Sequence, residues 1–517
     1  MSQDPPTIDL EREKRLESGT NSSFDSGSAN HDLEASTKKE AGVTVSVTSS
    51  DVTPQSELPR LRKHIILLVV SWVQFFDIFN SCSAIIALPE IEKALGFTQS
   101  TLQWVLSAYT LTFAACMLIA GRVCDIFHPK PVFLTGCFIV GLLGIPLGAS
   151  VHPIMTIVLR AAQGIGAAMT IPSAVSMVTT TFPDPNERGR AYAIYGAFGA
   201  VGNALGFVLG GVISSKASWR WVFYLIAILM TPFGIIAWFV LPNPQPGEGS
   251  SKGKTLDWPG VGTLTAGLVL FVYAITEAGS QGWRSPAVLA TLIISIFLFG
   301  GFLLVEKLVS DPAFPPRTWF YKNFTPMFFY AWTVYWWLFS IELQLVQVFQ
   351  NLWGLTSIAA AIRCIPLGIV GGVTAYLVGL FAPKTPRIPL LLSGQVLMAV
   401  GSVLFALAVG EDKYWSYVVP GIIVGTSGLS LAYVGSMIVV MEGAKPGQEG
   451  VVSAVMYTAY QIGATLGLAI VTSITVGVNQ GRAADPISQH VGYAASFWSI
   501  LGANGVGIFI TILFVRN

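Results

Sequence analysis

Long apolar segments separated by short polar connections fill the chain from residue 64 to residue 515. A helix needs about 20 apolar residues to cross the ~30 Å hydrocarbon core of a bilayer. Because a bilayer interior offers no water to backbone N–H and C=O groups, such segments must be helical. The pattern predicts an all-α polytopic membrane protein of about fourteen spans, at 64–88, 101–120, 132–150, 153–175, 191–213, 219–241, 259–278, 286–307, 325–348, 356–380, 388–409, 416–441, 450–477 and 493–515.

The segment before the first span has a different composition. It is polar, rich in Ser and Thr, and nearly free of aromatic residues. Such a segment cannot bury enough apolar surface to offset the entropy lost on ordering it. We therefore predict a disordered cytoplasmic tail at 1–62. The tail has no apolar stretch behind a basic start, so it does not resemble a secretory signal peptide, and the first span would direct targeting.

Composition agrees with a membrane protein and excludes other classes. Of 517 residues, 53% are hydrophobic and 11% charged, and the net charge of +1 gives no reason to expect nucleic acid binding. None of the five cysteines has metal-ligand or disulfide-framework spacing, so we expect no metal or cofactor. Motifs of metalloproteases, serine hydrolases and P-loop ATPases are missing from the sequence, so we expect neither an enzyme nor an ATP-driven pump.

The distribution of Lys and Arg predicts the orientation. If the N-terminus is cytoplasmic, about sixteen basic residues fall on cytoplasmic connections and about six on outer ones. The positive-inside rule therefore places both termini in the cytoplasm. The outer residues are Lys93, Lys216, Arg220, Arg284, Lys413 and Arg482.

Two cytoplasmic connections suggest internal duplication. The segments 121–131 and 379–387 both begin with Gly, contain Lys near prolines, and follow the second and the tenth span. Two related six-helix halves with two inserted helices would place them at equivalent positions, and such repeats usually frame a site near the membrane midplane. The predicted parts are the N-terminal half at 63–241, a linker with two extra helices at 242–323, and the C-terminal half at 324–517.

The connection after the second span carries the strongest local motif. It reads Gly-Arg-Val-Cys-Asp-Ile-Phe-His-Pro-Lys from residue 121, and it resembles the signature loop of the major facilitator superfamily. In that family the loop Asp pairs with charges on neighbouring helices and so latches one conformation. The sequence departs from the family pattern at His128 and Pro129, where Gly and Arg are usual. The resemblance implies a conformational latch at Gly121, Arg122, Asp125 and Lys130.

The fourth span places a charge inside an apolar helix. Arg160, Gln163 and Gly164 match the family's Arg, Gln and Gly motif, and they share one face of the helix. An Arg at the bilayer centre costs at least about 2.5 kcal/mol, so it should face the protein interior and have a partner. The resemblance implies a transport role for Arg160 and Gln163, and a structural tie is the alternative.

The first span offers the partner. Its polar stripe includes Gln74 and Asp77. Whether Asp77 carries a proton would depend on its burial and on its distance from Arg160, and both can change with conformation. Proton coupling requires a group whose protonation changes with conformation in this way. Fourteen-helix drug–proton antiporters usually carry their carboxylate at the position of Asn80 in this sequence, one turn after Asp77. Either the charge has moved to Asp77 or the coupling has changed, and a packing role for Asp77 is the alternative.

The fifth span has a glycine stripe. Small residues at helical spacing allow two helices to approach closely, and packing is the simplest interpretation. Its second part resembles the antiporter motif Gly-Pro-x-x-Gly-Gly, with Phe207 in place of Pro, so the kink that Pro would impose is not expected. The motif positions are Gly202, Gly206, Gly210 and Gly211.

Together, these matches resemble the fungal branch of fourteen-helix facilitators, which includes aminotriazole-resistance-type exporters, borate exporters and low-affinity ammonium transporters. The ninth span is aromatic, and such side chains bind flat or cationic substrates through cation–π contacts or pack against lipid. Glu342 is expected near the lipid headgroups. The cavity candidates are Trp104, Tyr109, Tyr330, Trp336, Arg363, Tyr457 and Gln461.

Three functions remain open at this point. The resemblance implies a secondary transporter that exports a small solute or drug in exchange for protons through Asp77 and Arg160. The first alternative is an uncoupled or uptake facilitator of a small polar solute such as ammonium or borate. The second is a membrane sensor that does not transport. We expect a monomer whose partners are the substrate, protons and the bilayer, in the plasma membrane ahead of the vacuolar membrane.

Overall fold

The structure is a computed structural model that describes residues 59–243, 257–282, 284–309, 316–382, 385–443, 449–483 and 485–516. The first helix begins at Arg60, so the last residues of the predicted tail are helical. The rest of the predicted tail, residues 1–58, lies outside the described residues.

In the described parts of the chain, fourteen long helices cover the predicted spans, and their ends differ from the predicted bounds by at most seven residues. They are α1 (Arg60–Leu95), α3 (Trp104–Phe127), α4 (Pro129–Gly148), α5 (Pro153–Thr181), α6 (Pro185–Lys216), α7 (Arg220–Val240), α8 (Trp258–Gln281), α9 (Pro286–Leu308), α10 (Phe324–Gln347), α11 (Ser357–Phe381), α12 (Arg387–Ala406), α13 (Val419–Gly443), α14 (Glu449–Asn479) and α15 (Pro486–Phe514). Short helices occupy the connections: α2 (Gln99–Leu102), η1 (Pro316–Phe320), η2 (Val348–Leu352), η4 (Glu411–Lys413) and η5 (Tyr414–Val418).

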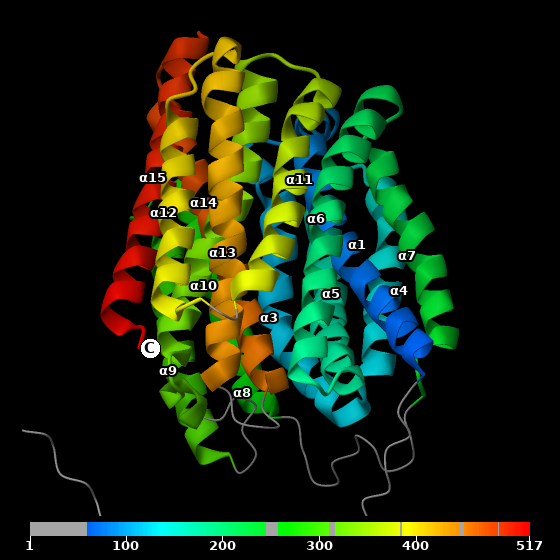
Figure 1. Ribbon diagram of the computed structural model, residues 1–517. Helices are drawn as coiled ribbons and strands as arrows, with labels where there is room; N and C mark the ends of the chain where they lie inside the picture. Colours follow the sequence, from blue (N-terminus) through cyan, green and yellow to red (C-terminus); the bar gives the residue numbers. More distant parts are fainter. Residues whose placement is uncertain are drawn as a thin grey trace, which may run out of the picture. The chain divides into compact units, whose positions relative to one another are not determined.

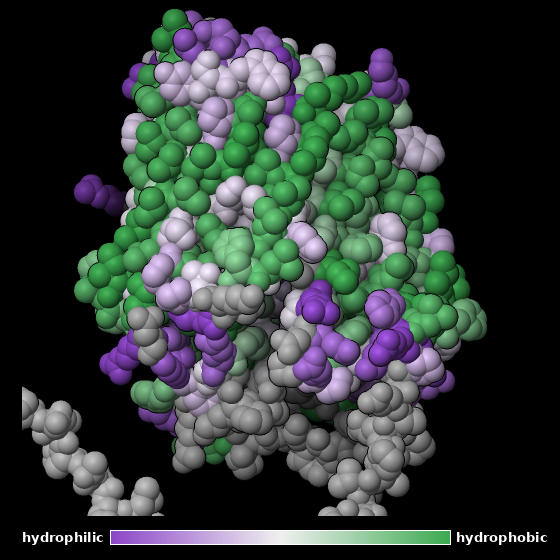
Figure 2. All heavy atoms as spheres, in the orientation of Figure 1, coloured by the Kyte–Doolittle hydropathy of each residue, from purple (hydrophilic) through white to green (hydrophobic). Residues whose placement is uncertain are grey.

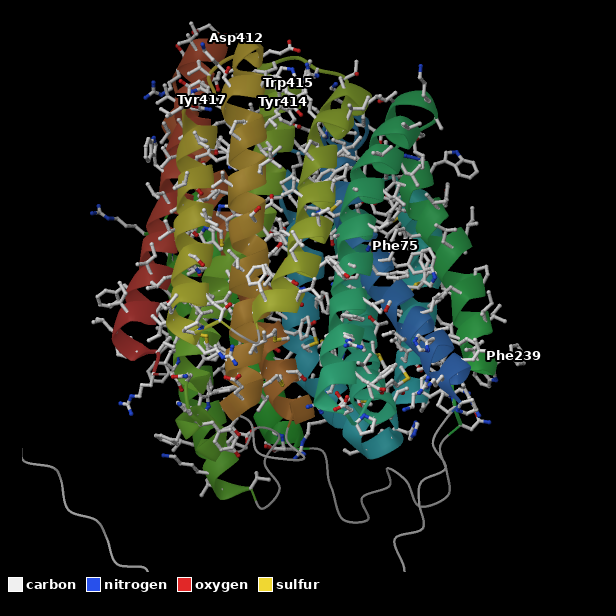
Figure 3. The ribbon with its side chains drawn as sticks, viewed as in Figure 1. Phe75, Phe239, Asp412, Tyr414, Trp415 and Tyr417 are labelled. Carbon is white, nitrogen blue, oxygen red and sulfur yellow. The ribbon has the colours of Figure 1, made fainter. Side chains whose placement is uncertain are left out.

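The helix surfaces match a bilayer. Thirteen helices in the described parts are long and apolar enough to cross a membrane, and α10, with its Trp, Tyr, Gln and Glu side chains, is the long helix missing from that set. Figure 2 shows a broad apolar band between more polar ends. Large apolar side chains point outward from this band, among them Phe239 of α7, which is 81% exposed (Figure 3). These surfaces identify a multi-pass membrane protein.

Helix pairing is repeated in two sets of six helices (Figure 1). The pairs α1–α6, α3–α5, α4–α5 and α4–α7 recur as α10–α14, α11–α13, α12–α13 and α12–α15. The two sets contact each other through α6 with α11 and α3 with α14, while α8 packs on α9, α3 and α14. The fold is therefore two six-helix halves with α8 and α9 inserted between them. The predicted boundaries at 63, 241 and 323 stay predictions.

Close contact between α1 and α6 depends on glycine. A Cβ on Gly202 would lie 2.4 Å from the carbonyl oxygen of Phe75. Gly206 and Gly210 face the next turns of α1, whereas Gly211 faces the start of α11. Helix α6 runs unbroken through Phe207, as the absence of Pro at this position predicted, and its only proline lies in the first turn. The two helices can therefore touch along their backbones.

The turn between α3 and α4 shows how His128 is accommodated at the position where the family motif usually has Gly. His128 has φ 79° and ψ 144°, a conformation that favours glycine, and its Nδ1 accepts a hydrogen bond from the backbone N–H of Lys130. The ammonium of Lys130 donates to the Leu241 carbonyl (2.7 Å) and to Asn243 Oδ1 (2.6 Å), which ties α4 to the end of α7. The side chain of the predicted latch residue Asp125 lies outside the described residues.

Candidate functional site

Arg160 lies fully buried on α5, at the centre of the N-terminal half. Its Nε donates to the Val105 carbonyl (2.9 Å), and its Nη1 donates to Gln163 Oε1 (2.8 Å) and Asn80 Oδ1 (3.3 Å). The guanidinium also lies 4.5 Å from the centre of the Tyr109 ring, a cation–π contact. Uncharged groups from α1, α3 and α5 therefore surround the charge.

The amides around Arg160 hold one another in place. Asn80 Nδ2 donates to Gln163 Oε1 (3.3 Å), and Gln163 Nε2 donates to the Val140 carbonyl of α4 (3.0 Å). The sequence suggested Asp77 as the partner of Arg160, but within the described helices Asn80 takes that position and Asp77 forms no ion pair with Arg160.

Gly164 sets the distance between Arg160 and Tyr109. A Cβ on Gly164 would lie 2.3 Å from the Tyr109 carbonyl oxygen and 2.2 Å from Thr112 Oγ1. The Thr112 hydroxyl donates to the Ala161 carbonyl of α5 (2.7 Å). Because no side chain separates the two backbones, α3 and α5 come close enough for the guanidinium to lie over the phenol ring.

Asp77 is connected to Arg160 through Tyr109. The Tyr109 hydroxyl donates a hydrogen bond to Asp77 Oδ1, while the same ring lies under the guanidinium. Asn80 and Arg160 are fully buried, but Asp77 keeps partial exposure halfway along a 36-residue helix. Gln74, one turn earlier, packs on Gly199 of α6, and its Oε1 has no partner among the described residues. Asp77 is thus a partly exposed residue beside a fully buried cation.

A cluster of tyrosines, most of them from the C-terminal half, lies near this site. The rings of Tyr335 (α10) and Tyr433 (α13) lie 4.8 and 5.2 Å from the ring of Tyr460 (α14), and the hydroxyls of Tyr433 and Tyr457 are 3.0 Å apart. Tyr335 is within electrostatic range of Asp77. So is Tyr195 of α6, whose buried hydroxyl has no partner among the described residues. We call Tyr195, Tyr335, Tyr433, Tyr457 and Tyr460 the tyrosine cluster. Of these, Tyr457 was a cavity candidate from sequence, and Tyr335 belongs to the aromatic ninth span that the sequence analysis singled out.

Several other candidates lie away from this centre. Trp104 donates to Glu277 Oε1 (3.1 Å) and ties α3 to the inserted α8, and Tyr330 donates to the Leu391 carbonyl (3.0 Å) and ties α10 to α12. Arg363 pairs with Glu411, in the connection between α12 and α13. Trp336 of α10 packs on Gly467 of α14. Gln461 is buried on α14, one turn before Thr465, whose hydroxyl donates to Thr110 of α3.

Glu342 is a buried polar residue that the sequence misplaced. It is 1% exposed, not at the headgroups as expected, because the helical path of α10 continues through η2 to Leu352. Asn203 Nδ2 of α6 donates to Glu342 Oε1, and Cys82 Sγ of α1 donates to Oε2 (3.8 Å). A single Glu near the end of an apolar span gave no sign of these partners.

The fold and this centre define a polytopic membrane protein whose two halves enclose charged and aromatic side chains. The chain belongs to the Major Facilitator Superfamily, whose sequence pattern matches residues 67–468. It is 30% identical over 468 residues to the Major facilitator superfamily multidrug transporter mfsC of Aspergillus fumigatus, covering 86% of each chain.

Two further comparisons extend this result. The chain is 28% identical over 440 residues to the Low affinity ammonium transporter of Saccharomyces cerevisiae, covering 81% of this chain and 82% of that one. The solved structure of the human organic anion transporter MFSD10 superposes with a TM-score of 0.61 at 15% identity, over 88% of this chain and 100% of the other, and shows the shared fold. The protein is a membrane transporter and not an enzyme, which confirms both predictions.

Proposed function

We propose that the protein exports a small solute or drug in exchange for protons, and that Asp77 binds the coupling proton. The observation that carries the proposal is the partly exposed Asp77 inside the bundle, whose carboxyl accepts a hydrogen bond from Tyr109 and forms no ion pair among the described residues. Such a carboxyl can exchange a proton with water that enters between the halves. The resemblance to fungal exporters and the multidrug relative support the direction and the substrate class.

The proton and the substrate would use adjacent surfaces. Ionised Asp77 accepts from the Tyr109 hydroxyl, and protonated Asp77 no longer attracts a cation as strongly. The tyrosine cluster offers ring faces and hydroxyls opposite Asp77, which suit flat or cationic substrates. A cationic substrate that approaches Asp77 would compete with the proton there, and this competition is what exchange requires.

Proteoliposomes with an imposed proton gradient test the proposal. Ammonium, borate, aminotriazole and a cationic dye are added one at a time while lumenal pH is recorded. We expect one of them to trigger proton movement in the unsubstituted protein and in Glu277→Gln, which makes the same carboxyl-to-amide change on inserted helix α8. Asp77→Asn should lose that movement. Full substrate-triggered proton movement in Asp77→Asn would overturn the proposal.

Uncoupled facilitation is the second candidate, and the ammonium relative favours it. In that case ammonium flux would be indifferent to the pH gradient and unchanged in Asp77→Asn. The third alternative, a sensor that does not transport, is set aside because the chain belongs to a family of transporters.

A further inference from the structure

Glu342 lies where the two halves meet. Its carboxyl, on α10 of the C-terminal half, accepts from Asn203 on α6 and from Cys82 on α1, both in the N-terminal half. All three side chains are buried, and each belongs to the second half of its helix, toward the end of the bundle away from the start of α1 and the end of α15 (Figure 1). We call this end the far end. One carboxyl therefore joins three helices across the interface.

The surroundings of this carboxyl contain no positive charge. The titratable groups facing it are Cys82 from α1 and Cys364 from α11, while α6 contributes the neutral Asn203. Asp77, five residues earlier on α1, lies within electrostatic range of Cys82. Among the described residues no Lys or Arg pairs with Glu342. A buried carboxylate without a cation is strongly disfavoured, whereas a buried carboxylic acid is tolerated.

The amide of Asn203 shows how a proton could be accommodated. Its Nδ2 donates to Glu342, but its Oδ1 is buried and has no partner among the described residues. Asn can turn its amide over, which exchanges the donor for the acceptor. A protonated Glu342 would then donate its O–H to Oδ1, so the pair remains joined in the protonated state.

We propose that Glu342 is a second proton-binding site, at which a bound proton favours contact between the halves at the far end. Loss of the proton leaves a charge that only water can stabilise, so it favours separation of α10 from α1 and α6. The inference deepens the proposed proton coupling, because it adds a group that couples protonation to the movement of the halves. It assigns this role to Glu342 independently of Asp77.

The test measures the distance between the halves at the far end. Exposed Ser215, in the last turn of α6, and exposed Asp412, in the connection before α13, are replaced by Cys in the full chain and spin-labelled. Figure 3 shows Asp412 at the far end. The native cysteines are buried or partly buried, so the unsubstituted chain provides the labelling blank. Distances are recorded by pulsed electron resonance in proteoliposomes from about pH 5.5 to about pH 8, the range in which perturbed carboxyls titrate.

We expect two distance populations, a short one in which the far end is closed and a long one in which it is open. The closed-to-open ratio of these populations should fall as the pH rises, by up to about tenfold per pH unit for one proton. Glu342→Gln keeps an oxygen for Asn203 but cannot ionise, so it should stay closed at every pH. Asp77→Asn should keep the pH response, and this separates the two sites. A pH response in Glu342→Gln equal to that of the unsubstituted chain would overturn the inference and leave the role of Asp77 untouched.

A second variant covers the case in which Glu342→Gln does not fold. Asn203→Ala removes the donor but leaves Glu342 able to titrate. It should lower the closed-to-open ratio at every pH, and the ratio should still fall as the pH rises. If the ratio became independent of pH in Asn203→Ala, the inference would fail, because Glu342 would still be present and ionisable.

Discussion

Gly202→Ala should loosen the contact that positions Asp77. The new Cβ would lie 2.4 Å from the Phe75 carbonyl oxygen, 3.0 Å from its Cα and 3.1 Å from its carbonyl carbon, all backbone atoms that cannot rotate away. Ordinary contact begins at 3.4 Å, so α1 and α6 must separate locally by about 1 Å. Overpacking of this kind costs roughly 1–3 kcal/mol. The displaced segment of α1 leads directly into Asp77 and Asn80.

Gly196→Ala is the matched control on the same helix. Nothing lies within 4 Å of its added Cβ, so the helix should gain about 0.5–1 kcal/mol from the better helix former. Thermal unfolding of both purified variants in one detergent, together with transport in proteoliposomes, gives the comparison. We expect Gly202→Ala to unfold several degrees below Gly196→Ala and to transport less. Equal midpoints for the two variants would refute the close-contact argument.

Three further substitutions have defined outcomes. His128→Gly should be more stable than His128→Ala by roughly 1–3 kcal/mol and unfold at a higher temperature. Both variants lose the hydrogen bond from the Lys130 N–H to the imidazole, and only glycine relieves the backbone conformation. Equal thermal midpoints would contradict this. Arg160→Lys should abolish transport in a folded protein, because a compact ammonium cannot reproduce the planar fork that reaches the Val105 carbonyl from Nε and Gln163 from Nη1, and retained flux would show that the guanidinium is dispensable. Lys130→Met should lower stability by roughly 1–3 kcal/mol, because it removes the ammonium bonded to the Leu241 carbonyl; an unchanged thermal midpoint would show that this tie is unimportant.

The spans could be predicted because length and polarity are local properties. Each predicted segment corresponds to one long helix. Phe207 stands where the family motif has Pro, and α6 is unbroken there, as this replacement predicted. Arg160 and Gln163 were also predictable, because an intramembrane charge must be buried and satisfied. The repeated helix pairs agree with the duplication that the two short connections indicated.

The partners of these residues could not be predicted, because they depend on helix rotation. Asp77 and Asn80 are three residues apart on α1, yet one lies beside Tyr109 and the other beside Arg160. Glu342 was misplaced for a related reason. It lies ten residues before the end of η2, a rise of about 15 Å, so it is well inside the bundle. The tyrosine cluster joins four helices, and no sequence spacing connects them.

The separation of Asp77 from Arg160 bears on whether exchange can occur at all. A carboxylate paired directly with a buried guanidinium would be held ionised, since protonation would leave that cation unpaired. Here Arg160 is satisfied by two amides and a backbone carbonyl, so its position does not depend on the charge of Asp77. The field of Arg160 still reaches Asp77 past the Tyr109 ring, but no ion pair joins the two side chains among the described residues. Asn80 therefore matters here because its amide satisfies Arg160 without adding a negative charge, and Asp77 is left as the carboxyl that can gain and lose a proton.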